Sequence, residues 1–232
     1  MNIIKLLICA VFAYLVGNIQ TSILISLAKH DDIRTHGSGN AGSTNMVRVY
    51  GLKFGLLTFF CDFGKAFIAV AAAKWLIPLI PSSGTDFTQI GVYLSGFCVV
   101  LGHNFPVFFG FRGGKGVATS FAAVWAVFGM CNGDFIIPIL TTVFGIGMVI
   151  ITGIVSVGSL TGALAEFITA LVIYGAKHDA GACVLALALF LLLFLRHTKN
   201  IVRILHGEEK KLFGKKDEKS AEPETEKETE TV

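Results

Sequence analysis

Seven apolar segments, separated by polar connections, run through the first 195 residues of this chain. A helix needs about 20 mainly apolar residues to cross a hydrocarbon core of about 30 Å, and most of the segments approach that length, although the fourth and the seventh are short. We therefore predict an all-α integral membrane protein with seven transmembrane helices. The predicted spans cover residues 3–27, 54–79, 90–107, 116–130, 135–151, 157–174 and 182–195.

Charged residues are scarce, and many of them lie near the C-terminus. They make up 15% of the 232 residues, against about 25% in soluble domains. Eleven of them fall within residues 213–232. With a mean hydropathy of +0.71, the composition excludes a disordered chain, a soluble nucleic-acid binder and a secreted disulfide scaffold. We divide the chain into a membrane domain, 1–212, and a charged tail, 213–232, that we predict to be disordered.

The five cysteines occur singly within apolar runs and form no C-x-x-C pair. Neither a zinc site nor a disulfide framework is therefore expected. We predict no metal, no cofactor and no nucleic-acid partner.

Lysine and arginine near the ends of the spans predict the orientation in the membrane. Eleven of them lie in the first and third connections and just after the last span, and three lie on the opposite side. Positive charge is retained on the cytoplasmic side. We therefore expect an extracytoplasmic N-terminus, a cytoplasmic C-terminus and an active site at the cytoplasmic face.

The first polar stretch, residues 36–48, is rich in glycine, asparagine and hydroxyl groups. Glycine and asparagine permit left-handed backbone conformations, which direct successive N–H groups into one concavity suited to an anion. Arg48 would add a planar guanidinium for a phosphate. A flexible linker is the alternative interpretation. The candidate ligands are Ser38, Gly39, Asn40, Thr44, Asn45 and Arg48.

The second polar stretch, residues 102–120, contains a Gly-Gly-Lys-Gly turn that leads directly into an apolar helix. Free N–H groups at the helix N-terminus and Lys115 would favour an anion there. The turn is not a Walker A box, because Phe109 and Gly116 occupy two of its required positions. The nearby phenylalanines either anchor the chain at the membrane surface or line the entry of an acyl chain. The candidate ligands are His103, Gly113, Gly114, Lys115 and Gly116.

The third polar stretch is divided between residues 155–159 and residues 196–209. On a continuing helix, His197 and Asn200 are three residues apart and share a face, with Arg203 one turn further. A histidine at a helix C-terminus is more often a dipole partner than a catalyst, and the cations nearby also serve as topology signals. Ser156 and Ser159 are alternative candidates for a serine at the same site.

Three ionisable residues lie within predicted spans, where charge is costly and needs a partner or a wet cavity. Asp62 and Lys65 are three residues apart, so we expect an internal ion pair that fixes helix packing, with a substrate role as the alternative. Glu166 has no evident partner in the sequence.

The three polar stretches resemble the three motifs of the bacterial acyl-phosphate:glycerol-3-phosphate acyltransferases, which are multi-pass enzymes of phospholipid synthesis. The resemblance covers the chain from the first span to about Lys211. It departs at Ser43, where alanine is more usual, and at residues 17–21, where a Gly-Ser-Ile-Pro pattern is usual. It implies transfer of an acyl group from an acyl phosphate to the 1-hydroxyl of glycerol 3-phosphate, giving lysophosphatidic acid and phosphate.

The resemblance also implies roles for the residues that match its motifs. The expected catalytic residues are Lys115, His197, Asn200, and Ser156 or Ser159. The expected substrate-binding residues are Ser38, Gly39, Asn40, Thr44, Asn45, Arg48, His103, Gly113, Gly114, Gly116 and Arg203. Structural roles are expected for Glu209, Asp62 and Lys65. The implied location is the bacterial inner (plasma) membrane, with membrane lipid as a partner and a functional link to the soluble enzyme that makes the acyl phosphate.

Two other functions can be compared with the sequence. None of the six histidines is followed by aspartate five positions later, which argues against the acyltransferases that carry that signature. A transporter or channel for a small phosphorylated anion is the alternative. It predicts motifs near mid-membrane and on both faces, whereas the predicted motifs gather on one face.

Overall fold

The computed structural model describes residues 2–80 and 86–212, which form helices and no strand. The tail predicted over 213–232 lies outside the described residues. The α-helices are α1 (Asn2–Gly17), α2 (Thr21–Ala28), α3 (Ser43–Tyr50), α4 (Leu52–Leu76), α5 (Thr88–Asn104), α6 (Val117–Val124), α7 (Ile136–Thr152), α8 (Val155–Ala176), α9 (Ala180–Arg196) and α10 (Thr198–Leu205). Short 3₁₀ helices cover η1 (Ile33–Thr35), η2 (Ile77–Leu79) and η3 (Val107–Phe109), and a π-helix, η4 (Trp125–Cys131), continues α6.

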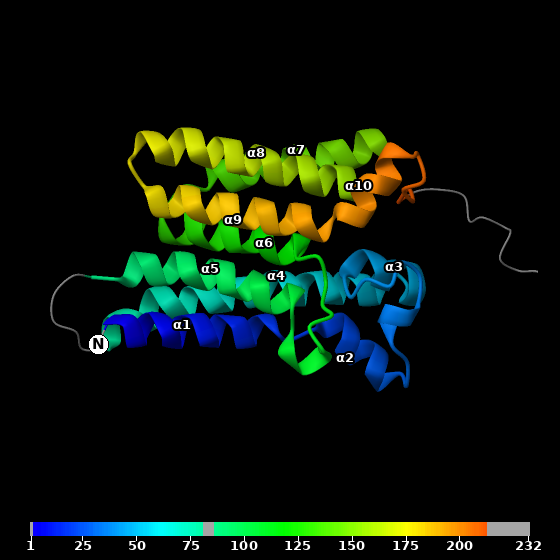
Figure 1. Ribbon diagram of the computed structural model, residues 1–232, viewed down its shortest axis with the longest axis horizontal. Helices are drawn as coiled ribbons and strands as arrows, with labels where there is room; N and C mark the ends of the chain where they lie inside the picture. The colour runs from blue at the N-terminus through cyan, green and yellow to red at the C-terminus, as the bar shows by residue number, and fades with distance from the viewer. Residues whose placement is uncertain (1, 81–85, 213–232) are drawn as a thin grey trace, which may run out of the picture.

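The long helices lie side by side in an elongated bundle (Figure 1). Helix α1 packs against α4 and α5, and α8 packs between α7 and α9. Helix α6 joins the two groups through contacts with α4, α5 and α9. The short helices α2, α3 and α10 lie together at one end of the bundle, on the right in Figure 1. The connections between α5 and α6 and between α7 and α8 reach the same end.

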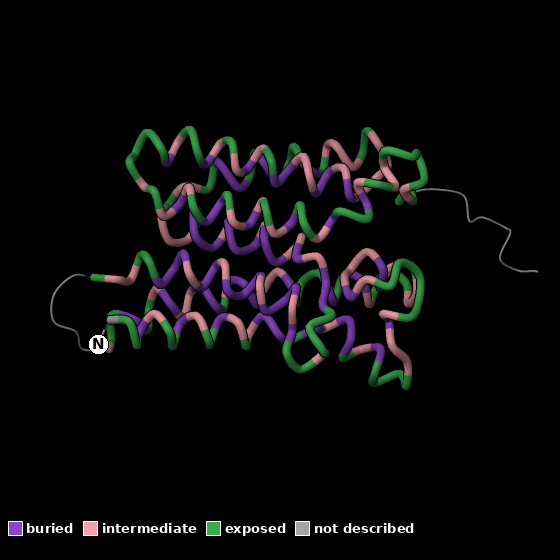
Figure 2. The backbone as a smooth tube through the Cα atoms, in the orientation of Figure 1, coloured by how far each residue is buried: buried purple, intermediate pink, exposed green. Residues whose placement is uncertain are grey.

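Apolar side chains face both inward and outward in this bundle. The core is built largely from small residues, among them Ala66, Ala69, Ala122 and Ala123, which let the helices approach closely. Figure 2 shows the buried positions along the inner sides of the helices. Large apolar residues such as Ile150 and Ile151 are more than 70% exposed. An outer surface of this kind suits contact with lipid.

Three helices are long and apolar enough to cross a membrane by length and composition: Leu52–Leu79, Thr88–Phe109 and Val155–Ala176. The number rises to five if each of two bent helix pairs counts as one span. The remaining apolar segments, Val117–Cys131 and Ile136–Thr152, are shorter. Seven spans therefore remain a prediction, although all seven predicted segments are helical.

The first predicted span is not one continuous helix, because α1 and α2 are separated by a bend of 40°. The helix ends at Gly17, where a Cβ would lie 2.2 Å from the carbonyl oxygen of Val99, so only glycine allows this approach to α5. The side chain of Asn18 then donates to the carbonyl of Tyr14 at 2.7 Å. The break frees the carbonyl of Ile19, which accepts a hydrogen bond from a lysine in α4.

The helix expected to continue through His197 is also bent. Helices α9 and α10 meet at His197 at an angle of 61°. The first turns of α8 begin at Val155, so both candidate serines lie on a helix rather than in a connection. The bend at His197 and the start of α8 at Val155 place both parts of the third polar stretch at the end of the bundle where α3 lies.

Candidate active site

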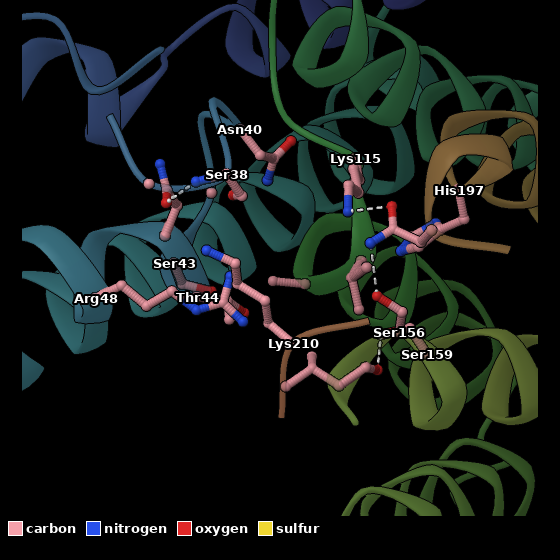
Figure 3. Close-up of a pocket in the computed structure, with 18 of the residues that line it drawn as sticks. Ser38, Asn40, Ser43, Thr44, Arg48, Lys115, Ser156, Ser159, His197 and Lys210 are labelled. Atoms are coloured by element: carbon pink, nitrogen blue, oxygen red, sulfur yellow. Dashed lines mark hydrogen bonds between the residues drawn. The ribbon is translucent and has the colours of Figure 1, made fainter. Parts of the chain in front are cut away.

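A cavity of about 410 Å³ opens at the end of the bundle that carries α3 and α10. Its walls come from the first, second and third polar stretches together (Figure 3). The predicted site residues that line it are Ser38, Asn40, Thr44, Asn45, Arg48, Asp62, His103, Lys115, Gly116, Ser156, Ser159, His197, Asn200, Arg203 and Glu209. Gly39, Gly113, Gly114 and Lys65 do not line it and lie behind its walls.

The first wall is the loop before α3. Gly37 and Gly39 adopt positive φ angles of 61° and 68°, conformations that disfavour other residues. Asn45 holds this loop in shape: its Oδ1 accepts from the N–H of Ser38 at 2.9 Å, and its Nδ2 donates to two loop carbonyls. The amide of Asn45 is therefore hydrogen-bonded to the loop, and the residue also lines the cavity.

The second wall is the Gly-Gly-Lys-Gly loop before α6. Arg196 holds it, donating from Nη2 to the carbonyls of Gly113 and Gly114 at 3.1 and 2.9 Å. A Cβ on Gly114 would lie 2.2 Å from His103 Nε2 and 2.8 Å from the carbonyl oxygen of Ala41. The two glycines are thus buried packing positions, and they set the place from which Lys115 reaches the cavity.

A hydrogen-bonded network joins the second wall to the third. Lys115 Nζ donates to Asn200 Oδ1 at 2.6 Å, and Asn200 Nδ2 donates to Ser156 Oγ at 2.9 Å and to Glu209 Oε1 at 2.5 Å. Ser156 donates to Glu209 at 2.6 Å, and Arg203 donates to the other carboxylate oxygen at 2.7 Å. Glu209 is the centre of this network, which gives it a structural role.

The geometry separates the two candidate serines. Ser156 belongs to the network, whereas the hydroxyl of Ser159 donates to the carbonyl of Val155 within α8 at 2.9 Å. Figure 3 shows both beside His197, across the cavity from Arg48 and Thr44. Ser156 is therefore the better candidate for contact with a substrate.

Burial and neighbouring cations act on the charge states of two site residues. The pKa of Lys115 is lowered to about 8, chiefly by burial and also by Arg203, Arg48 and Arg196, against the opposing effect of Glu209. Burial, with Lys115 next, lowers the pKa of His197 to about 4. The ammonium of Lys115 bonds to a neutral amide, so its charge is available to an anion.

His197 is held in a defined tautomer. Its Nδ1 lies 2.8 Å from the carbonyl oxygen of Leu193, which can only accept a hydrogen bond. The proton of the neutral ring is therefore on Nδ1, and Nε2 is left as a hydrogen-bond acceptor. His197 also lines the cavity, so the site includes a histidine ring whose second nitrogen is an acceptor.

The ion pair between Asp62 and Lys65 is present at 2.8 Å, with both residues buried. His103 joins it, because its Nδ1 lies 2.8 Å from Lys65 Nζ. Glu166 is also buried, within α8. Nothing in the sequence connects His103 with the pair, because Lys65 lies 38 positions earlier in the chain.

Two further residues belong to the cavity or its support although neither is among the predicted site residues. Arg196 holds the glycine-rich loop and stacks over the ring of Phe105 at 5.1 Å, and Lys210 lines the cavity (Figure 3). In the sequence both count among the positive charges that predict topology, and Arg196 also stands beside His197 in the third motif. The spacing of Lys210 one position after Glu209 was the only signal that could have identified it.

The fold and the cavity together define a membrane protein whose site is suited to an anionic ligand. A family model described as glycerol-3-phosphate acyltransferase matches residues 7–207. The chain belongs to this family, and the family resemblance predicted from the three motifs is confirmed.

Relatives of this name cover most of the chain. Glycerol-3-phosphate acyltransferase of Clostridioides difficile is 41% identical over 218 residues, which are 94% of this chain and 100% of that protein. The Aquifex aeolicus protein of the same name is 36% identical over 205 residues, 88% of this chain and 98% of that protein. Both relatives thus match this chain over nearly their full length.

Two crystal structures share the fold. Both are of PlsY (YgiH), an integral membrane glycerol 3-phosphate acyltransferase, in its glycerol 3-phosphate form and its lysophosphatidic acid form. Each is 34% identical to this chain and covers 90% of it, with TM-scores of 0.76 and 0.74. This chain covers 96% and 95% of those chains.

Proposed function

We propose that this protein transfers a fatty acyl group from an acyl phosphate to the 1-hydroxyl of glycerol 3-phosphate, releasing lysophosphatidic acid and phosphate. The observation that carries the proposal is the set of cations in one cavity. Lys115, Arg48, Arg203 and Lys210 line it, and only Arg203 pairs with a carboxylate among the described residues. Both proposed substrates carry a phosphate, and the uncompensated cations offset their mutual repulsion.

The proposed chemistry needs little from the protein beyond placement. The 1-hydroxyl oxygen attacks the acyl carbon, the bond from that carbon to the phosphate oxygen breaks, and phosphate leaves. His197 Nε2 accepts the hydrogen bond from the attacking hydroxyl and orients it. With a pKa of about 4, His197 is a weaker base than the departing phosphate, which therefore takes the proton.

The proposed setting is the cytoplasmic face of the bacterial plasma membrane. Seven spans, with the N-terminus outside and the C-terminus inside, would direct the cavity toward the cytoplasm, where the positive charges gather. Glycerol 3-phosphate would enter from water, and the acyl chain would stay in lipid. A soluble enzyme that makes the acyl phosphate would supply the donor.

The direct test is the release of inorganic phosphate by purified, detergent-solubilised protein. Palmitoyl phosphate is expected to release phosphate only when glycerol 3-phosphate is added, with one lysophosphatidic acid formed per phosphate. Palmitoyl-CoA serves as the control donor and is expected to give no product. Release that does not depend on glycerol 3-phosphate, or transfer from palmitoyl-CoA alone, would overturn the proposal. A transporter would instead move phosphate across vesicles without acyl transfer.

Replacing Lys210 with alanine is expected to raise the KM for glycerol 3-phosphate about tenfold and to leave kcat within about twofold. The ammonium contributes charge to the cavity without taking part in the hydrogen-bonded network, so ground-state binding is what is lost. Lys211→Ala is the matched control, because the Lys211 side chain lies over Gly153 instead of in the cavity. Equal effects of the two substitutions would contradict the assignment.

The affinity for glycerol 3-phosphate is expected to fall about tenfold between pH 7 and pH 9. Lys115 has a pKa of about 8 in the free protein, and a phosphate dianion binds its protonated form. As pH rises through this value the ammonium loses its proton, and the apparent KM rises in inverse proportion to the fraction of Lys115 that is still protonated. The phosphate itself is already a dianion in this range.

The measurement is a KM profile for the wild type and for Lys115→Arg. Guanidinium stays protonated throughout, so the variant is expected to show a flat profile even where its overall activity is lower. A wild-type KM that does not change between pH 7 and pH 9 would exclude Lys115 as the titrating ligand.

A further inference from the structure

The buried triad formed by Asp62, Lys65 and His103 lies behind the Gly-Gly-Lys-Gly loop, and each of its members is less than 5% exposed. Three buried polar groups of this kind are costly between membrane helices unless every donor finds an acceptor. Lys65 meets that requirement. Its Nζ lies 2.8 Å from the carbonyl oxygen of Ile19, 2.8 Å from Asp62 Oδ1 and 2.8 Å from His103 Nδ1.

These contacts fix the tautomer of His103. An ammonium has three protons to donate and cannot accept, so the ring nitrogen that faces it must be the acceptor. Asp62 would favour a proton on the same nitrogen, but its carboxylate oxygen lies 3.6 Å away, beyond hydrogen-bond distance, while the ammonium lies at 2.8 Å. Nδ1 therefore lacks a proton, and the proton of the neutral ring lies on Nε2.

The protonated Nε2 of His103 lies at the edge of the cavity. His103 is among the lining residues, and its Nε2 lies against the loop that carries Lys115, since a Cβ on Gly114 would lie 2.2 Å from this nitrogen. Within residues 2–80 and 86–212, Nε2 has no hydrogen-bond acceptor. A neutral N–H group of fixed direction is thus available beside the proposed phosphate site.

We propose that His103 Nε2–H donates a hydrogen bond to a phosphate oxygen of glycerol 3-phosphate, and that Lys65 and Asp62 are positioning residues that hold His103 in the donor tautomer. The identity of the phosphate rests on the proposed function. His103 and His197 then have opposite hydrogen-bonding roles. One ring is fixed as a donor toward a phosphate oxygen, and the other is fixed as an acceptor toward a hydroxyl.

A pair of amide substitutions separates binding from a purely structural role. The side-chain amide of glutamine reaches the position of Nε2 and retains a donor there. That of asparagine reaches only the position of Nδ1, where its carbonyl can still accept from Lys65. His103→Gln is therefore expected to keep affinity for glycerol 3-phosphate within about threefold of wild type. His103→Asn is expected to lose about tenfold to a hundredfold, the cost of one bond to a charged group.

The experiment is calorimetric titration of each detergent-solubilised protein with glycerol 3-phosphate, together with its melting temperature. Affinity is expected to depend on a donor at the position of Nε2, and stability is expected to depend on an acceptor at the position of Nδ1. His103→Asn is therefore expected to melt at a higher temperature than His103→Gln. A structural role alone gives the reverse order of affinities. That order, equal losses in both variants, or no loss in either would overturn the proposal.

A second measurement is independent of acyl transfer. With ¹⁵N-labelled histidine, the His103 signal, assigned by its loss in His103→Gln, is expected to be that of a neutral ring protonated at Nε2 between pH 6 and pH 8. Added glycerol 3-phosphate is expected to shift this Nε2 resonance. A proton on Nδ1 overturns the tautomer assignment, whereas binding with the expected shifts but without acyl transfer contradicts only the proposed reaction.

Discussion

Lys115→Ala is expected to reduce acyl transfer by about three orders of magnitude, the largest loss expected from any single side chain in the cavity. The ammonium comes from the second wall and reaches the third, where it bonds to Asn200 at 2.6 Å. It is partly buried, so a charge that develops on a phosphate beside it is stabilised more strongly than in water. Alanine removes that charge and leaves the carbonyl of Asn200 without its donor.

The measurement is kcat/KM with palmitoyl phosphate, accompanied by the far-ultraviolet circular dichroism and melting temperature of the purified protein. Lys199→Ala is the matched control, since Lys199 is exposed on α10 and does not line the cavity. It is expected to retain activity within about twofold. A Lys115→Ala protein that is folded and keeps more than about a tenth of wild-type activity would contradict the assigned role.

Gly114→Ala is expected to lower kcat/KM about a hundredfold, through a single added methyl group. That group would approach His103 Nε2 to 2.2 Å and the carbonyl oxygen of Ala41 to 2.8 Å, and neither neighbour is the free end of a flexible side chain. The loop must therefore shift, and it carries Lys115 with it. A displacement of about 1 Å at a reacting group is enough for a loss of this size.

Gly147→Ala in α7 is the control for adding the same methyl group elsewhere. Nothing lies within 4 Å of the position that a Cβ would take there. Because alanine favours a helix over glycine, this variant is expected to be as stable as wild type or slightly more so. If Gly114→Ala keeps the same kcat/KM as Gly147→Ala, the added methyl group does not displace Lys115, and the prediction is wrong.

The sequence predicted the site better than it predicted the helix geometry. Residues such as Arg48, Lys115 and Asn200 could be identified because polar and glycine-rich stretches stand out between apolar segments. Their convergence in one cavity also followed from three polar stretches expected at one side. The predicted residues 3–27 and 196–203 were each expected to be continuous, yet both are bent.

These differences in helix geometry have physical causes that the pattern of apolar residues does not reveal. The break after Gly17 depends on a backbone contact with α5, some 80 positions later, and apolar composition continues across it. The hydrogen bonds of Asn45 could not be predicted for a similar reason, because a side-chain amide that binds loop carbonyls and one that binds substrate look alike in sequence. The contact of Arg196 with the glycine-rich loop could not be predicted either, because its partners lie more than 80 positions earlier in the chain.

The network around Glu209 also bears on the order in which the protein becomes competent during synthesis. The residues of this network are spread along the chain from Lys115 to Glu209. The N–H of Leu212 donates to the carbonyl of Gly153 at 2.7 Å, and this bond holds the segment that carries Glu209 against the third wall. The loop before α3 supplies Ser38 and α3 supplies Arg48 early in synthesis, whereas Glu209 and Lys210 complete the lining of the cavity only near the end of the described chain. A chain that ended before residue 209 would thus keep helices α1 to α10 and lack the carboxylate that joins Ser156, Asn200 and Arg203.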